Sequence, residues 1–216
     1  MFPNAVMQVI ALMEIAISSA IVLICLTQAV FIKEKNNVRM MALRVLVCFV
    51  IANLMFWPIF ALILPLELPL AAYVRGYTGE LSITSMLILW TAYFSPKELK
   101  VPTFMKAWIA LVAITFYPLA LGVGMLDPYA WGYGSIAFLA AVIATALIAL
   151  LMGSNRMAII LAIAILAWAA GWHESANLWD YILDPFLGFW AIGSLIQSAL
   201  RARKARAQTG YLFRKG

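Results

Sequence analysis

The chain has 216 residues, of which 66% are hydrophobic and 11% are charged, and its mean hydropathy is +0.99. Soluble domains average about 45–50% apolar and 25% charged residues. This composition excludes a water-soluble globule, because a fold of this size cannot hide so many apolar side chains from water. We therefore expect an integral membrane protein. Its formal net charge of +6 is interpreted from the positions of the basic residues along the chain.

Seven apolar stretches, separated by polar residues, have about the length needed to cross a hydrocarbon layer of ~30 Å. They are residues 5–32, 43–66, 79–95, 105–125, 134–152, 157–172 and 181–200. The stretches are continuously apolar rather than alternating, which favours helices over strands, since lipid offers no partner to an open strand edge. The sequence predicts an all-α bundle of seven transmembrane spans in one domain, residues 1–200, followed by a basic cytoplasmic tail, residues 201–216.

Basic residues flank the connections after the first, third and fifth spans and fill the tail. They are Lys33, Lys35, Arg39, Arg44, Lys97, Lys100, Lys106, Arg156, Arg201, Arg203, Lys204, Arg206, Arg214 and Lys215. The opposite side of the predicted bundle holds Arg75 alone. Because Lys and Arg stay in the cytoplasm, we expect the N-terminus outside and the C-terminus inside. The cations then face lipid headgroups and not nucleic acid, which fits a multi-pass protein of the bacterial cytoplasmic membrane.

The first predicted span contains a carboxylate, Glu14, about ten residues from its start. An ionised carboxylate is costly to bury in lipid, so this side chain is protonated, paired or directed at a wet cavity. Asn53 in the second span lies at comparable depth and is the expected partner. Two interpretations stay open, namely a proton-coupling site and a neutral hydrogen bond that joins two helices.

A second candidate lies at the mouth of the third span, where Arg75 precedes a segment with two glycines and several hydroxyl side chains. A guanidinium in this position offers a fork for a phosphate or a carboxylate. The lysine of a nucleotide-binding loop is missing, so a lipid-linked phosphate is the more suitable ligand. The alternative is a helix start that is capped by Thr78 and carries Glu80 in its first turn.

Further acidic residues gather at the predicted outer ends of the helices, near the single histidine of the chain. They are Glu67, Glu80, Asp127, Glu174, Asp180 and Asp184, with His173 beside them. Asp180 and Asp184 share a face if a helix already begins at 180, which would allow them to bind a divalent cation or share a proton. Helix capping is the competing interpretation for this segment.

We expect no metal centre and no cofactor. Closely spaced His and Cys residues, which mark zinc and copper sites, do not occur in the sequence. Because His173 is the single histidine, one chain cannot hold a haem with two histidine ligands.

The outer turns contain a repeated phrase. Leu126-Asp127-Pro128-Tyr129 and Leu183-Asp184-Pro185-Phe186 are each followed, several residues later, by a Gly-Ser pair. An internal duplication would place related hairpins around a common site. Ordinary turn and helix-start chemistry explains the same residues, so both interpretations stay open.

The short loops and the abundance of Trp, Phe and Met favour helices that contact partner helices. We therefore expect a non-catalytic membrane subunit or partner of a larger envelope assembly, bound to partner membrane subunits or to copies of itself. A small transporter or flippase for a lipid-like or small solute, with Glu14 coupling protons, is the first alternative. An outer-leaflet enzyme acting on a lipid-linked phosphate, through the outer acids with Arg75 or His173, is the second.

Overall fold

The computed structural model describes residues 4–31, 38–62, 66–95 and 101–212. All regular elements within these ranges are helical, and no strand occurs in them, so the all-α prediction is confirmed for this part of the chain. Several residues that define the predicted orientation lie outside the described residues, namely Lys33, Lys35, Lys97, Lys100, Arg214 and Lys215.

Eleven helical elements follow one another in these ranges. They are α1 (Asn4–Phe31), α2 (Val38–Phe56), η1 (Ile59–Leu62), α3 (Leu70–Thr78), α4 (Ile83–Phe94), α5 (Thr103–Ala120), η2 (Tyr129–Gly132), α6 (Ile136–Leu151), α7 (Asn155–Ala169), α8 (Trp179–Ile182) and α9 (Pro185–Leu212). Each of the seven predicted stretches overlaps one of the longer helices. The short helix α3 lies between the second and third predicted stretches, where no helix was expected.

Two described helices are long and apolar enough to cross a membrane, Val6–Thr27 within α1 and Thr103–Ala120 in α5. Four further apolar helices are shorter: Met41–Phe56, Ile83–Phe94, Ile136–Leu151 and Asn155–Ala169. Helix α4 begins four residues later than the predicted span because Ser82 caps it, its Oγ accepting the Ser85 N–H at 3.1 Å.

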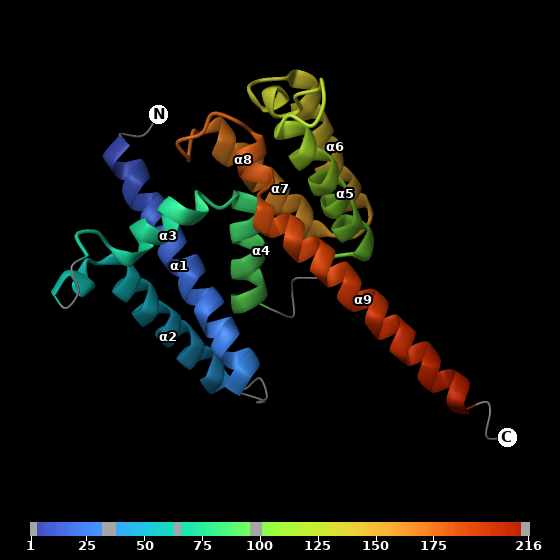
Figure 1. Cartoon of the computed structure of the whole chain (residues 1–216), viewed down its shortest axis with the longest axis horizontal. Helices are drawn as coiled ribbons and strands as arrows, with labels where there is room; N and C mark the ends of the chain where they lie inside the picture. The colour runs from blue at the N-terminus through green and yellow to red at the C-terminus, as the bar shows by residue number, and fades with distance from the viewer. Residues whose placement is uncertain (1–3, 32–37, 63–65, 96–100, 213–216) are drawn as a thin grey trace.

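The helices form two groups with α4 between them (Figure 1). In one group α1 packs against α2 and α3; in the other, α5 packs against α9 and α6 packs against α7. Helix α4 contacts both α1 and α7 and so joins the groups. Each group has its own buried apolar cluster, around Ile21 of α1 and around Met105 of α5.

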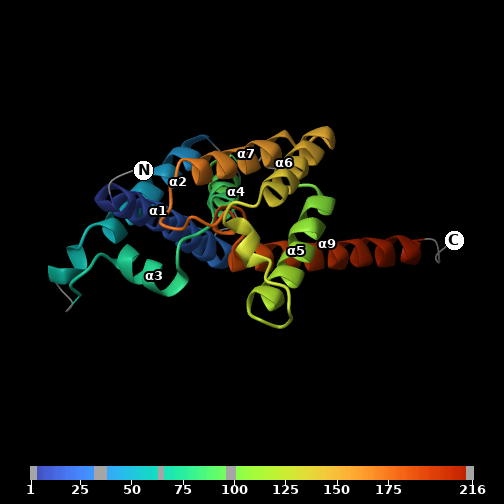
Figure 2. The same ribbon diagram turned by 90° about the horizontal axis from the view of Figure 1, so that it is seen from above.

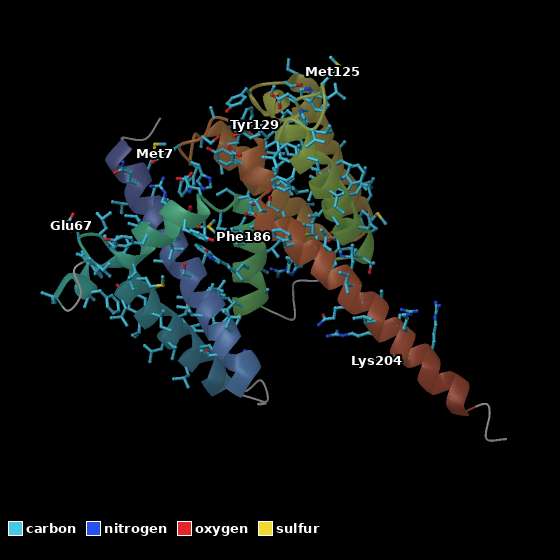
Figure 3. All side chains as sticks on the ribbon, in the orientation of Figure 1. Met7, Glu67, Met125, Tyr129, Phe186 and Lys204 are labelled. Atoms are coloured by element: carbon cyan, nitrogen blue, oxygen red, sulfur yellow. The ribbon has the colours of Figure 1, made fainter. Side chains whose placement is uncertain are left out.

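Helix α9 continues far beyond the rest of the molecule, as Figure 2 shows from above. Residues 201–212 of the predicted basic tail are helical, as the last part of α9. Residues 201–206 are exposed. Figure 3 places Lys204 at one end of the molecule, whereas Met7, Met125 and Tyr129 lie toward the opposite end.

Candidate functional site

A pocket of about 650 Å³ opens at the end of the molecule opposite to the basic part of α9. Its wall comes from the end of α3, the end of α5, the start of η2 and the segment that leads into α9. The lining residues are Arg75, Gly79, Glu80, Phe116, Tyr117, Ala120, Leu121, Tyr129, Glu174, Ser175, Asp180, Leu183, Asp184 and Pro185. Five of the predicted site residues thus meet around one cavity, which we call the outer pocket. Asp127, also predicted, is exposed and does not line it.

Glu14 meets the chain immediately after α7 and not the second helix. Its Oε1 accepts the indole N–H of Trp172 at 2.7 Å, and its Oε2 lies 3.3 Å from His173 Nε2. The predicted pairing with Asn53 is wrong, because the Asn53 amide donates to the Phe49 carbonyl within α2, at 2.8 Å. An Asn side chain in a helix finds this acceptor one turn away, whereas the Glu14 contacts depend on tertiary packing.

His173 lies between two carboxylates, and both its backbone N–H and its ring contact Tyr181. It is 4% exposed, and its Nδ1 lies 3.7 Å from Glu80 Oε2, opposite the nitrogen that faces Glu14. The ring stacks on Tyr181 with 4.9 Å between centroids, and the His173 N–H donates to the Tyr181 hydroxyl at 2.9 Å. The imidazole therefore connects the carboxylate of α1 with a carboxylate of the outer pocket.

Arg75 is already occupied by carboxylates of its own chain. It donates to Glu80, and its Nη2 also lies 2.9 Å from Glu174 Oε1. Burial alone would lower the pKa of Arg75, but hydrogen bonds to Glu174 and Glu80 and the charges of both raise it above its ordinary value. The predicted fork exists, yet its ligands are internal, which leaves it poorly suited to an external phosphate.

The predicted cap of this segment is wrong. Thr78 ends α3, and its hydroxyl donates to the Val74 carbonyl at 2.9 Å, whereas Ser82 caps α4. Gly79 has a φ of +73°, a conformation that favours glycine and turns the chain between the two helices. Glu80 consequently sits in the connection, where it reaches both Arg75 and His173.

Asp184 is buried and both of its oxygens accept backbone N–H groups. Oδ1 accepts from Leu187 at 2.7 Å and so caps α9, while Oδ2 accepts from Ser82 at 2.8 Å, at the start of α4. This carboxylate ties together the beginnings of two helices that are far apart in sequence. The capping interpretation describes Asp184 well, with Pro185 as the first residue of α9.

Asp180 faces a different partner set from Asp184. Its Oδ2 accepts the Tyr129 hydroxyl at 2.9 Å and also the Ser175 hydroxyl. Burial, followed by the hydrogen bonds to Tyr133 and Asp180, raises the pKa of Tyr129 well above its ordinary value, so this phenol stays a neutral donor at physiological pH. No group of three His, Cys, Asp or Glu residues among the described positions is arranged to hold a metal ion.

Sequence reasoning missed the aromatic part of the pocket. Phe116 and Tyr117 lie at the end of α5, and Tyr129 begins η2. Tyr129 belonged to the repeated Asp-Pro phrase, which was the one available signal. Asn177 fixes the position of Tyr129 relative to α8. Its amide donates to the Tyr129 carbonyl at 2.9 Å, and its Oδ1 accepts the Trp179 N–H.

An apolar groove of about 440 Å³ lies beside the outer pocket, between α9 and the group formed by α1, α3 and α4. The two hollows share a wall, since residues 78–81 and 183–187 contribute to the lining of one or the other. Within that wall runs the hydrogen bond from Ser82 to Asp184. The acidic pocket and the apolar groove are therefore lined by neighbouring residues of the same two segments.

Comparison of the chain with protein-family models, with curated proteins and with solved structures finds no match.

Proposed function

We propose that this chain is a multi-pass membrane carrier that binds a solute in the outer pocket and couples its movement to a proton held around Glu14 and His173. The observation that carries this proposal is the connection of a carboxylate in the most apolar long helix, through one buried imidazole, to a carboxylate of the pocket. Ionisable groups within apolar helices are typical of proton relays. Histidine changes charge close to neutral pH, which suits such a relay.

The membrane topology in this proposal has seven spans with the N-terminus outside and the C-terminus in the cytoplasm. Its support comes from the composition, from the two long apolar helices and from the four shorter ones. The distribution of Lys and Arg supports the orientation. The outer pocket then opens on the outer side of a bacterial cytoplasmic membrane.

The expectation of a non-catalytic subunit in a larger envelope assembly stays a prediction. Exposed apolar side chains, such as Phe49 and Leu166, fit contact with lipid and contact with partner helices equally well. A docking role would not require the pocket or the contact between the partly buried Glu14 and the buried His173, so we favour the carrier.

The outer-leaflet enzyme has less support in the geometry. Its phosphate-binding group would be Arg75, which already pairs with Glu80 and Glu174. A phosphate would have to displace a carboxylate and then lie among the remaining acids, where like charges repel.

Proton movement through reconstituted protein tests the carrier directly. Liposomes that contain the purified chain and a trapped pH-sensitive dye are exposed to separate gradients of cationic, neutral and anionic solutes. We expect at least one solute to change the internal pH. We expect Glu14→Gln to reduce that rate at least about tenfold, because it removes the proton-accepting carboxylate of α1. Glu67→Gln is the matched control, since Glu67 is exposed and does not line the pocket.

Two results together would contradict the carrier. One is the absence of solute-driven proton movement for every class of solute. The other is native mass spectrometry that finds the chain in fixed stoichiometry with other membrane subunits, which is the behaviour of an assembly component.

A further inference from the structure

We infer that the ligand of the outer pocket is an organic ammonium group, and that its binding competes with a proton on His173. This inference rests on the proposed function for its physiological meaning, but it concerns binding and is tested without transport. Four features support it: the charge of the pocket, the pairing of its guanidinium, its aromatic wall and the buried imidazole behind Glu80.

The charge of the outer pocket favours a cation. Four carboxylates line it, Glu80, Glu174, Asp180 and Asp184, against one guanidinium, Arg75, so its formal charge is −3. Arg75 is engaged by two of those acids. An anionic ligand would meet no free positive group in the lining, whereas a cation would meet uncompensated carboxylates in a partly shielded site.

The chemistry of the wall favours an organic cation over a bare metal ion. Phe116, Tyr117 and Tyr129 line the pocket together with the acids. Aromatic faces attract ammonium groups and also cover their methyl or methylene groups, as in known sites for quaternary ammonium. Asp180 adds charge beside Tyr129, whose hydroxyl it accepts at 2.9 Å.

A separate observation concerns His173, which does not line the pocket but faces Glu80, a residue that does. The Nδ1 atom of His173 is shielded from solvent, has no hydrogen-bond partner, and faces Glu80 Oε2 at 3.7 Å. A neutral imidazole leaves this buried atom unsatisfied, which is unfavourable. Protonation would place a positive charge beside Glu80, and an ammonium in the pocket would supply that charge from the other side.

The groups that face His173 determine the direction of the pH effect. They are Glu14 from α1, Glu80 from the α3–α4 connection and Tyr181 from α8. Arg75 lies behind Glu80, and Glu174 pairs with Arg75. An ammonium group beside Glu80 would repel a positive charge on the imidazole. Ammonium affinity should therefore rise as the pH increases from 6 to 8, the range in which histidines lose their proton.

Choline and its neutral analogue 3,3-dimethyl-1-butanol form a matched pair of probes, because they have the same shape and differ in charge. Choline does not titrate, so any pH dependence belongs to the protein. With the full chain in phosphatidylglycerol nanodiscs, we expect calorimetry to show choline binding at least about tenfold tighter than the neutral alcohol at pH 8. Inorganic phosphate should show no binding.

Variants locate the site. Asp180→Asn keeps an acceptor for Tyr129 and removes one charge, and we expect it to weaken choline binding about tenfold. Tyr129→Phe should weaken it less, since the ring face stays. Glu67→Gln should leave the affinity unchanged, and His173→Gln should remove the difference between pH 6 and pH 8.

The same chemistry reaches the pocket from two sources, a free solute or an amine-bearing lipid headgroup. Phosphatidylethanolamine nanodiscs separate them: a lipid-borne ammonium competes with choline and weakens its apparent affinity, while a free-solute site binds choline equally in both lipids. Either result supports the inference.

Choline binding no tighter than the neutral alcohol in phosphatidylglycerol nanodiscs overturns the inference. Proton movement without ammonium binding would refute this inference but leave the carrier proposal standing. Ammonium binding without proton movement would refute the carrier proposal but support this inference.

Discussion

Two aspartates in the same Asp-Pro motif have different structural roles. Asp127 is exposed and accepts the N–H groups of Tyr129 and Ala130, at 3.0 and 3.4 Å. Asp184 is 6% exposed, and each of its oxygens accepts an N–H from a different helix start. The motif predicts a cap in both places, but only the tertiary fold adds the second contact at Asp184.

Substitution of the two aspartates by alanine should therefore differ in cost. Asp184→Ala leaves two buried N–H groups without a partner, and we expect it to lower the free energy of unfolding by about 2–4 kcal/mol. Asp127→Ala should cost about 0.5–1 kcal/mol, as expected for an exposed cap. Unfolding in increasing denaturing detergent measures both, and equal costs would contradict the second contact of Asp184.

The two carboxylates that share Arg75 form a second matched pair. The Glu80 side chain is 20% exposed and also faces His173, whereas the Glu174 side chain is 55% exposed. We expect Glu80→Gln to lower the free energy of unfolding by about 1–2 kcal/mol. Glu174→Gln should change it by at most about 0.5 kcal/mol, because water screens an exposed ion pair. The reverse order in thermal unfolding would show that Arg75 depends on Glu174.

At the scale of the elements, α5 and α9 lie close together at Gly188. A Cβ atom at this position would lie 2.9 Å from the Cβ of Ala113, so a side chain there forces the helices apart. Five residues later in α9, a Cβ at Gly193 would meet nothing within 4 Å. The same helix thus offers a tight glycine and an open one.

We expect Gly188→Ala to destabilise the protein by about 1–3 kcal/mol through overpacking between the helices. Gly193→Ala should be neutral or stabilise by up to about 1 kcal/mol, because alanine favours the helix interior. Thermal unfolding of the purified variants measures both. If Gly188→Ala were as stable as Gly193→Ala, the packing of α5 against α9 would be incorrect.

The two copies of the repeated Leu-Asp-Pro phrase are followed by Gly-Ser pairs with different structural roles. Ser135 follows the first copy and caps α6, its Oγ accepting the Phe138 N–H. Ser194 follows the second copy but lies inside α9, where no cap is needed. The two Asp-Pro turns are alike, whereas the Gly-Ser pairs that follow them are used differently, so common turn chemistry explains the resemblance better than duplicated hairpins.

Most of the helices could be predicted because continuous apolar character reports directly on them, and the seven predicted stretches all contain helical residues. The acidic cluster was also predictable, since helix hairpins bring their ends together. The partner of Glu14 was not, because His173 lies 159 positions away and no spacing rule connects them. The aromatic wall was missed for the same reason, as it joins α5 to η2 across the pocket.

For the whole molecule, the proposed orientation places the outer pocket on one side of the membrane and the basic end of α9 on the other. Met125 is fully exposed near the pocket end, and Lys204 lies on the projecting helix (Figure 3). After replacement of Cys25 and Cys48, Met125→Cys should react with a membrane-impermeant thiol reagent in intact spheroplasts. Lys204→Cys should react only after permeabilisation. Labelling of both from the same side would contradict the seven-span topology.

Proton release on ligand binding tests the link between the pocket and the buried imidazole most directly. Choline is added to the purified chain in weakly buffered solution at pH 6 and at pH 8, and a dye reports the protons that appear. We expect choline binding to release protons, more of them at pH 6 than at pH 8, with no release in His173→Gln and unchanged release in Glu67→Gln. Choline that binds without releasing protons would contradict this link.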